Sequence, residues 1–172
     1  MFEEEPDKRK DIERLPVYQK AVEICDLVKK IIEIIEDELT SISGFELKMA
    51  ESTLQDMIGN SYLLPVKISG AATVDLYDLK MENAALIRKA ARELSVACTG
   101  LQMLGVEKSV DYLQVLRDEI ELFRIEFAEW VKTFNPWDYI IDRWGLFNPP
   151  GVNYDDHDPD DDLPFNPDDV NL

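Results

Sequence analysis

The sequence predicts an all-α fold: an antiparallel up-down-up-down four-helix bundle with a short C-terminal helix and a disordered acidic tail. Four long segments place apolar residues at spacings of three and four, the period of an amphipathic helix. No segment shows the period-two alternation of a strand, and the connections are short, which makes consecutive helices antiparallel. We therefore divide the 172 residues into a charged N-terminal arm (1–14), a four-helix bundle (15–134), an aromatic capping segment (135–148) and an Asp/Pro-rich acidic tail (149–172).

The first helix is predicted to begin at Pro16, because proline suits the first helical turn, and to end before Thr40. One heptad stripe along it consists of Tyr18, Ala21, Cys25, Val28, Ile32, Ile35 and Leu39. A second stripe beside it consists of Val17, Ile24, Leu27, Ile31 and Ile34. Together the stripes make an apolar face wider than one bundle seam needs. The second stripe is therefore a candidate oligomer interface; the alternative is a helix at the crowded centre of the bundle.

The second helix is predicted to begin near Ser43, where Glu46 completes a capping box, and to kink at Pro65, which removes one backbone hydrogen bond. Its apolar stripe consists of Met49, Leu54, Met57, Ile58, Leu64, Ile68 and Ala72.

The third helix is predicted from near Asp78 to Gly105, a residue that favours the end of a helix, and the fourth begins near Ser109. The third stripe consists of Leu79, Leu86, Ile87, Ala90, Leu94, Ala97, Leu101 and Leu104. The fourth consists of Leu113, Leu116, Ile120, Phe123, Phe127, Trp130 and Phe134.

Beyond the bundle, the Asn135–Pro136 pair stops the fourth helix. The following PWDYIIDRWGLF predicts a short helix that packs on the bundle end through Trp137, Ile140, Ile141 and Trp144. After Asn148 the chain is rich in Pro and Asp and is expected to be disordered. Its acidic groups are expected to compete with a polyanion for basic residues of the bundle, to attract a basic partner, or only to confer solubility.

Charge is distributed unevenly along the chain. The net charge is -18, and residues 135–172 contribute -9 of it, whereas residues 78–105 carry +1. A chain this acidic repels nucleic acid at long range unless its bases are clustered. The candidate contacts for a polyanion or a partner are Lys80, Arg88, Lys89 and Arg92. The alternative is a solvated helix face with ordinary ion pairs.

The residues that catalysis or metal binding would need are sparse. The one histidine, His157, lies in the acidic tail, without a second His or Cys nearby for zinc and away from any serine or cysteine nucleophile. The run DDHDPDDD lacks the glycine and terminal glutamate of a helix-loop-helix calcium site. Cys25 and Cys98 lie in apolar helical patterns and are expected to be buried thiols without a disulfide. We therefore expect neither enzymatic activity nor a cofactor or specific metal.

The N-terminal sequence MFEEEPDKRK lacks the apolar region of a signal peptide. No run approaches the roughly 18 apolar residues of a membrane span. A soluble cytoplasmic protein with no membrane partner is expected.

Three segments resemble a known family. LPVYQKAVEICDLVKKI is similar to the start of the small four-helix-bundle proteins encoded in ribosomal-RNA intervening sequences, NSYLLPVKISGAA resembles their second-helix motif, and ENAALIRKAARELSVACTGLQMLGV resembles their third helix. The accessory variability determinant proteins of diversity-generating retroelements share this fold. The resemblance covers roughly residues 13–132.

This resemblance implies a homopentamer arranged as a barrel around a central channel. For the retroelement branch it also implies a reverse-transcriptase partner and RNA contact through a basic surface, whose matching positions here are Arg88, Lys89 and Arg92. The chain departs from the family in its strong acidity and its Asp-rich tail.

Two functional hypotheses follow. An oligomeric accessory subunit for a reverse transcriptase and its RNA predicts that the basic residues of the third helix face outward together. A protein-only scaffold, whose acidic tail binds a basic partner, predicts that these bases are engaged in ion pairs.

Overall fold

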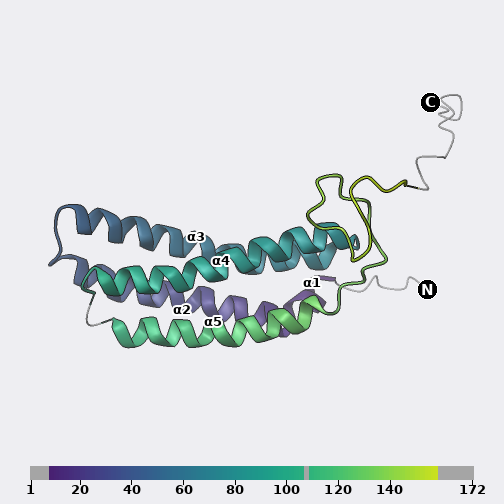
Figure 1. Ribbon diagram of the computed structural model, residues 1–172. Coiled ribbons are helices and arrows are strands. Elements are labelled where there is room, and N and C mark those ends of the chain that lie inside the picture. Colours follow the sequence, from purple (N-terminus) through teal and green to yellow (C-terminus); the bar gives the residue numbers. More distant parts are fainter. Residues whose placement is uncertain (1–7, 107–108, 159–172) are drawn as a thin grey trace, which may run out of the picture.

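The computed structural model describes residues 8–106 and 109–158, and within these ranges the regular structure is entirely helical. The helices are α1 (Lys8–Glu13), α2 (Pro16–Leu39), α3 (Phe45–Thr73), α4 (Tyr77–Met103) and α5 (Val110–Val131). The four long helices run alternately up and down the bundle (Figure 1). Each packs on the next, and α5 closes the bundle against α2. The all-helical bundle expected from the sequence is confirmed.

The N-terminal arm is partly helical. Residues 8–13 form α1, which packs on α2 and α3 and carries an exposed ion pair between Arg9 and Glu13 at 3.1 Å. The charged arm therefore includes a short helix, whereas residues 1–7 lie outside the described residues.

Helix α2 buries both of its apolar stripes inside the monomer. Val17, Ile24 and Ile31 are almost fully enclosed in the bundle core, while Leu27 and Ile34 are half-buried. The reason is that α2 packs on both α3 and α5, so it needs two covered faces. The three enclosed residues are not available to a second copy, and the expectation of an interface on this stripe is wrong for them. The wide apolar face belongs to a helix at the crowded centre.

Helix α3 begins later than expected and presents a shifted face. Its N-cap is Gly44, with φ +71° and no side-chain capping bond, so the Ser43–Glu46 capping box is wrong. The helix continues through Pro65 to Thr73. Its buried residues are Ala50, Leu54, Met57, Ser61, Leu64, Ile68 and Ala71. Met49 and Ile58 of the predicted stripe are exposed, because the helical repeat turns Ala50 and Ser61 toward the core instead.

Helices α4 and α5 agree closely with their predicted bounds. Gly105 follows the end of α4 with φ +84°, a backbone conformation that glycine adopts without strain. Ser109 precedes α5 but caps no backbone group with its side chain; the buried hydroxyl instead donates a hydrogen bond to the Glu38 carboxylate of α2. Within the predicted α4 stripe, Leu79 and Leu86 are exposed.

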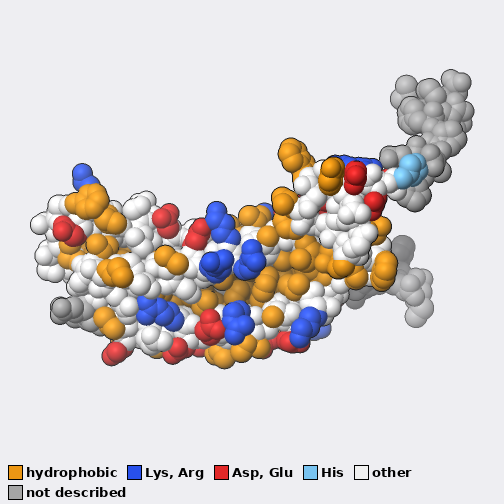
Figure 2. All heavy atoms as spheres, viewed as in Figure 1, with side chains coloured by type: hydrophobic (Ala, Val, Ile, Leu, Met, Phe, Trp, Pro, Cys, Tyr) orange, Lys and Arg blue, Asp and Glu red, His pale blue; other side chains and the backbone are white. Residues whose placement is uncertain are grey.

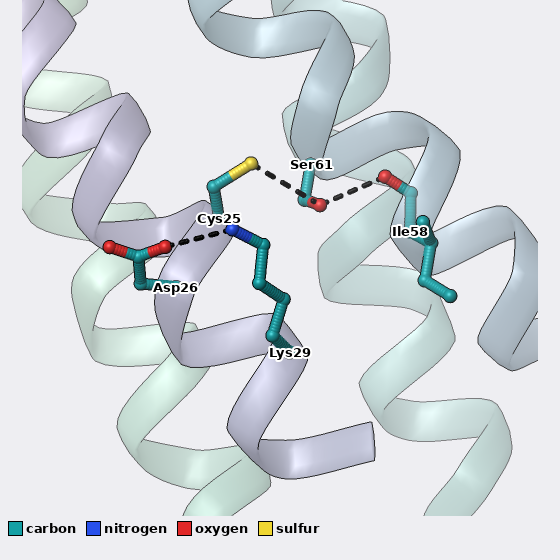
Figure 3. A network of polar contacts seen from close by, with 5 residues as sticks. All are labelled: Cys25, Asp26, Lys29, Ile58 and Ser61. Carbon is teal, nitrogen blue, oxygen red and sulfur yellow. Dashed lines mark hydrogen bonds and ion pairs between the residues drawn. The ribbon is translucent and has the colours of Figure 1, made fainter. Parts of the chain in front are cut away.

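A buried polar link joins α2 to α3 (Figure 3). The Cys25 thiol donates to the Ser61 hydroxyl at 3.7 Å, and that hydroxyl donates to the Ile58 carbonyl at 2.9 Å. Beside it, Lys29 forms an exposed ion pair with Asp26 at 3.0 Å. Cys25 and Cys98 are free and buried, as the sequence predicted.

Residues 136–147 form a series of turns, and the short helix expected there is wrong. The Asp142 carboxylate accepts hydrogen bonds from the backbone N–H groups of Trp144, Leu146 and Phe147 at 2.8–2.9 Å. Gly145, in the middle, has φ +72°, which no helix accommodates. One carboxylate therefore organises a tight turn in place of a helix.

This turn segment caps the bundle differently from the expectation. Ile141 is buried, but Trp137 and Trp144 are 82% and 90% exposed. The segment is attached to the bundle by a backbone hydrogen bond from the Tyr77 N–H at the start of α4 to the Asp138 carbonyl.

The structured chain continues past the predicted tail boundary at residue 149. The Arg143 guanidinium donates to the carbonyls of Tyr154 and Asp156 at 3.0 and 2.8 Å, and residues 149–158 form turns. The expectation of disorder from residue 149 is therefore wrong for 149–158. Residues 159–172 lie outside the described residues.

Candidate partner-binding groove

A hollow of about 740 Å³ lies between α4 and α5, which we call the α4–α5 groove. From α4 it is lined by Arg88, Ala91, Arg92, Ser95 and Val96. From α5 its apolar lining consists of Ile120, Phe123, Phe127, Ala128 and Val131. The small side chains of Ala91, Ser95 and Ala128 leave the space between the two helices unfilled. The groove follows from the placement of small residues where longer apolar ones would close the seam.

The floor of the groove is apolar and continues an aromatic row along α5. Phe123 is buried and stacks on the half-buried Phe127, with ring centroids 6.1 Å apart. Phe127 contacts Trp130 at 6.3 Å, and Trp130 meets Phe134 edge-on at 4.9 Å. Val96, on the opposite wall, is 70% exposed. An apolar ligand group placed here would be removed from water on two sides.

Three arginines border this apolar floor. Arg88 and Arg92 lie one helical turn apart on α4, and both are exposed. Over the described ranges, neither one forms an ion pair. Arg124 of α5 lies on the other wall and pairs with Glu121, also in the lining, at 2.8 Å. In Figure 2, basic side chains lie over both α4 and α5 with an apolar band between them. The groove is locally basic in a chain of net charge -18.

The four predicted basic contacts do not form one site. Arg88 and Arg92 line the groove, whereas Lys89 forms an exposed ion pair with Glu93 at 3.6 Å. Lys80 lies near the start of α4, 5.5 Å above the Phe134 ring, in a different hollow of the surface. Of the four, only Arg88 and Arg92 line the same hollow.

Sequence reasoning missed Arg124. Arg124 directly follows Phe123, a residue of the predicted fourth-helix stripe, so the sequence already places it beside a buried face. Arg124 lies opposite Arg88 and Arg92 because α5 packs on α4. The net charge of the α4 segment alone does not indicate this arrangement.

Burial raises the pKa of the Cys98 thiol to about 11, so the thiol is neutral near pH 7 and a poor nucleophile. Within residues 8–106 and 109–158, no three His, Cys, Asp or Glu side chains converge as metal ligands. The run 155–162, considered above for calcium, lies partly outside these ranges. None of the described helices combines the length and apolar character needed to cross a bilayer.

The fold and the groove together define an all-helical bundle with an arginine-bordered apolar groove on one seam. No protein-family model, curated protein or solved structure matches the chain.

Proposed function

We propose that this chain is a non-enzymatic accessory protein that binds a larger partner through the α4–α5 groove. The observation that carries the proposal is the pair Arg88 and Arg92, which are exposed and form no ion pair among the described residues while they border an apolar floor. Guanidinium groups recognise carboxylates and phosphates with two parallel hydrogen bonds, and the apolar floor adds hydrophobic affinity. Exposed arginines beside an apolar floor suit the binding of a partner. The hypothesis of an accessory subunit for a reverse transcriptase likewise predicts basic residues that face outward from the third helix.

The resemblance of the sequence to accessory variability determinant proteins supplies the partner: the reverse transcriptase of a diversity-generating retroelement together with its RNA. In this role the bundle orients the transcriptase and its template, and the chemistry belongs to the transcriptase. Long-range repulsion is expected, because the overall charge of -18 has the same sign as that of the RNA. Close contact at the groove must therefore supply the affinity.

Self-association is part of the proposal. With three residues of the predicted α2 interface enclosed in the core, support for a second copy shifts to α5, where exposed apolar residues form a separate face: Tyr112, Val115, Leu122 and Ile125. This α5 stripe lies outside the groove lining, so assembly and partner binding use different surfaces.

The test is retention of a retroelement reverse transcriptase and its template RNA on the affinity-tagged chain. The double variant Arg88→Glu/Arg92→Glu is expected to lower retention at least tenfold, with helicity unchanged because both side chains are exposed. The matched control is Lys30→Glu/Lys48→Glu, which makes the same change in charge at exposed sites on α2 and α3.

The two double variants separate groove binding from general electrostatics. Equal loss in both would show that only net charge matters and would reject the groove as the binding site. If the unaltered chain retains neither the transcriptase nor the RNA, the accessory role itself is rejected.

The alternative function is a protein-only scaffold whose acidic tail binds a basic partner. The Lys89–Glu93 ion pair and the eight Asp residues of 149–172 favour it. It predicts that a basic protein is retained without RNA, that Arg88→Glu/Arg92→Glu leaves retention unchanged, and that removal of residues 159–172 abolishes it.

A further inference from the structure

We infer that the C-terminal segment 159–172 binds in the α4–α5 groove of its own chain and competes there with an external partner. The inference rests on the proposed function in one respect, since it assigns regulation to the same groove.

The segment reads PDDDLPFNPDDVNL and combines five carboxylates with the apolar side chains of Leu163, Phe165, Val170 and Leu172. Leu163 and Phe165 are preceded by Asp160–Asp162 and followed by Asp168 and Asp169, and the segment contains no base. Pro164 and Pro167 restrict the backbone around the apolar pair, which lowers the entropy lost on binding. Leu163 and Phe165 thus form a short apolar core between two acidic flanks, and Val170 and Leu172 follow the second flank.

The groove offers the complementary pattern. Its floor is built from Ile120, Phe123 and Phe127, and its borders carry arginines on both helices. An RNA strand would use the arginines but gain little from the floor, because Phe123 is buried and Phe127 half-buried, so little aromatic surface is open for a base to stack on. A segment with Leu and Phe between aspartates uses both the floor and the borders, so the peptide is the occupant that the lining favours.

The described part of the chain ends on the same side of the bundle as one end of the groove (Figure 1). The turns of 135–158 lie at the end of the bundle where α4 begins and α5 finishes (Figure 1), and Val131, at that end of α5, lines the groove. From Val131 to Ile120 the helix rises only about 16 Å, at roughly 1.5 Å per residue. The apolar pair Leu163 and Phe165 follows the last described residue, Asp158, by five and seven residues, which span up to about 17–25 Å when extended. The chain length available to this pair is therefore comparable with the length of the groove.

Tethering makes a weak interaction effective. A segment joined by a short linker acts at an effective concentration on the order of millimolar, so even a modest affinity fills the groove in the absence of a partner. Its ionic part involves exposed arginines and weakens as salt screens them, with a Debye length of about 10 Å at 0.1 M and about 3 Å at 1 M. A partner with more contacts displaces the segment, which sets a threshold for partner binding.

The experiment places a photoreactive benzoylphenylalanine at Phe165 in the full-length chain, alone in solution at low micromolar concentration. After irradiation and digestion, mass spectrometry is expected to find crosslinks concentrated in residues 88–96 and 120–131 of the same chain, in a product with the 19.8 kDa mass of one chain. The same reporter at Tyr154, an exposed residue of the described turns, is the positional control and is expected to crosslink outside the groove.

Two variants test the proposed contacts. Arg88→Glu/Arg92→Glu, and separately Asp160→Asn/Asp161→Asn/Asp162→Asn, are each expected to reduce the groove crosslinks at least fivefold, as is 1 M salt. The asparagine variant changes no described residue, so it keeps the test decisive if charge reversal on α4 perturbs folding.

Crosslinks spread evenly over the surface, or groove crosslinks that neither variant reduces, would overturn the inference. Crosslinks between chains would overturn the assignment to the same chain and make the groove an interface between copies. Because neither transcriptase nor RNA is present, failure here leaves the retention assay of the proposed function intact, and failure of that assay leaves these crosslinks unaffected.

Discussion

Lys20 of α2 places its ammonium 2.9 Å from the carboxylate of Glu119 on α5, across the seam that closes the bundle. The same ammonium lies 2.7 Å from Glu23 on its own helix. The Lys20 and Glu119 side chains are only 27% and 29% exposed, so this pair is less screened than the ion pairs between exposed residues on single helices. The contact links the first and last long helices of the chain.

Replacement of Lys20 by Ala is expected to lower the free energy of unfolding by about 1 kcal/mol, the upper end of the range for ion pairs near the surface. Urea denaturation measures the change. Lys30→Ala, at an exposed site on the same helix, is the matched control and is expected to stay within about 0.5 kcal/mol of the unaltered chain. Equal effects of the two substitutions would show that the Glu119 contact contributes nothing.

The same contact makes stability depend on alkaline pH. Hydrogen bonds to Glu23 and then Glu119 raise the pKa of Lys20 above its ordinary value of 10.5. A raised pKa in the folded state means that the stabilisation is complete below pH 10.5 and is lost as pH rises through the folded-state value. The difference in stability between the unaltered chain and Lys20→Ala should therefore be constant at neutral pH and shrink above pH 10.5.

The Asp142 turn predicts an acid transition confined to residues 142–147. Hydrogen bonds from backbone N–H groups, that of Phe147 foremost, hold the pKa of Asp142 below its ordinary value of 3.8 despite partial burial. A lowered pKa means that the turn is fully stabilised above pH 3.8 and weakens as pH falls through the folded-state value. The amide chemical shifts of Leu146 and Phe147 should therefore titrate below pH 3.8.

Asp142→Ala removes the acceptor and should abolish that titration and shift both amides toward unstructured values at neutral pH. Helix content by circular dichroism should stay unchanged, because the turn lies outside the bundle. Asp155→Ala, at an exposed carboxylate in the neighbouring turns, should leave both amides as they are. Titration of the two amides in the Asp142→Ala chain would assign the transition to another carboxylate.

The features that were predictable from the sequence are those encoded by local periodicity. Pro16, Thr40 and Gly105 marked helix ends correctly because their backbone preferences act within one turn. The Asp142 turn was not predictable this way, because the spacing of Ile and Trp in 136–147 imitates a helix while one carboxylate and Gly145 determine a turn.

The groove was only half predictable for a related reason. Arg88 and Arg92 share a helix, so their proximity follows from a spacing of four. Arg124 joins them only because α5 packs beside α4, and burial of the second α2 stripe likewise depends on two neighbouring helices. Relations between elements far apart in the sequence required the three-dimensional fold.

Self-association should depend on the exposed α5 stripe. Burial of an aliphatic side chain stabilises an interface by roughly 1.5–3 kcal/mol. Leu122 and Ile125 are each about half exposed in the monomer, so contact with a second copy would bury apolar surface that water now covers. Light scattering of the unaltered chain at micromolar concentration is expected to give a multiple of 19.8 kDa, which is five-fold for the pentamer that the sequence resemblance implies. Leu122→Asp/Ile125→Asp is expected to reduce the mass to 19.8 kDa with helicity retained, since neither side chain is in the core.

Val66→Asp, at an exposed apolar site on α3, is the matched control and should leave the assembled mass unchanged. Loss of assembly in this control alone would move the interface to α3. A mass of 19.8 kDa for the unaltered chain up to 100 µM would reject self-association altogether, and the α5 stripe would then be an uncovered face of a monomer.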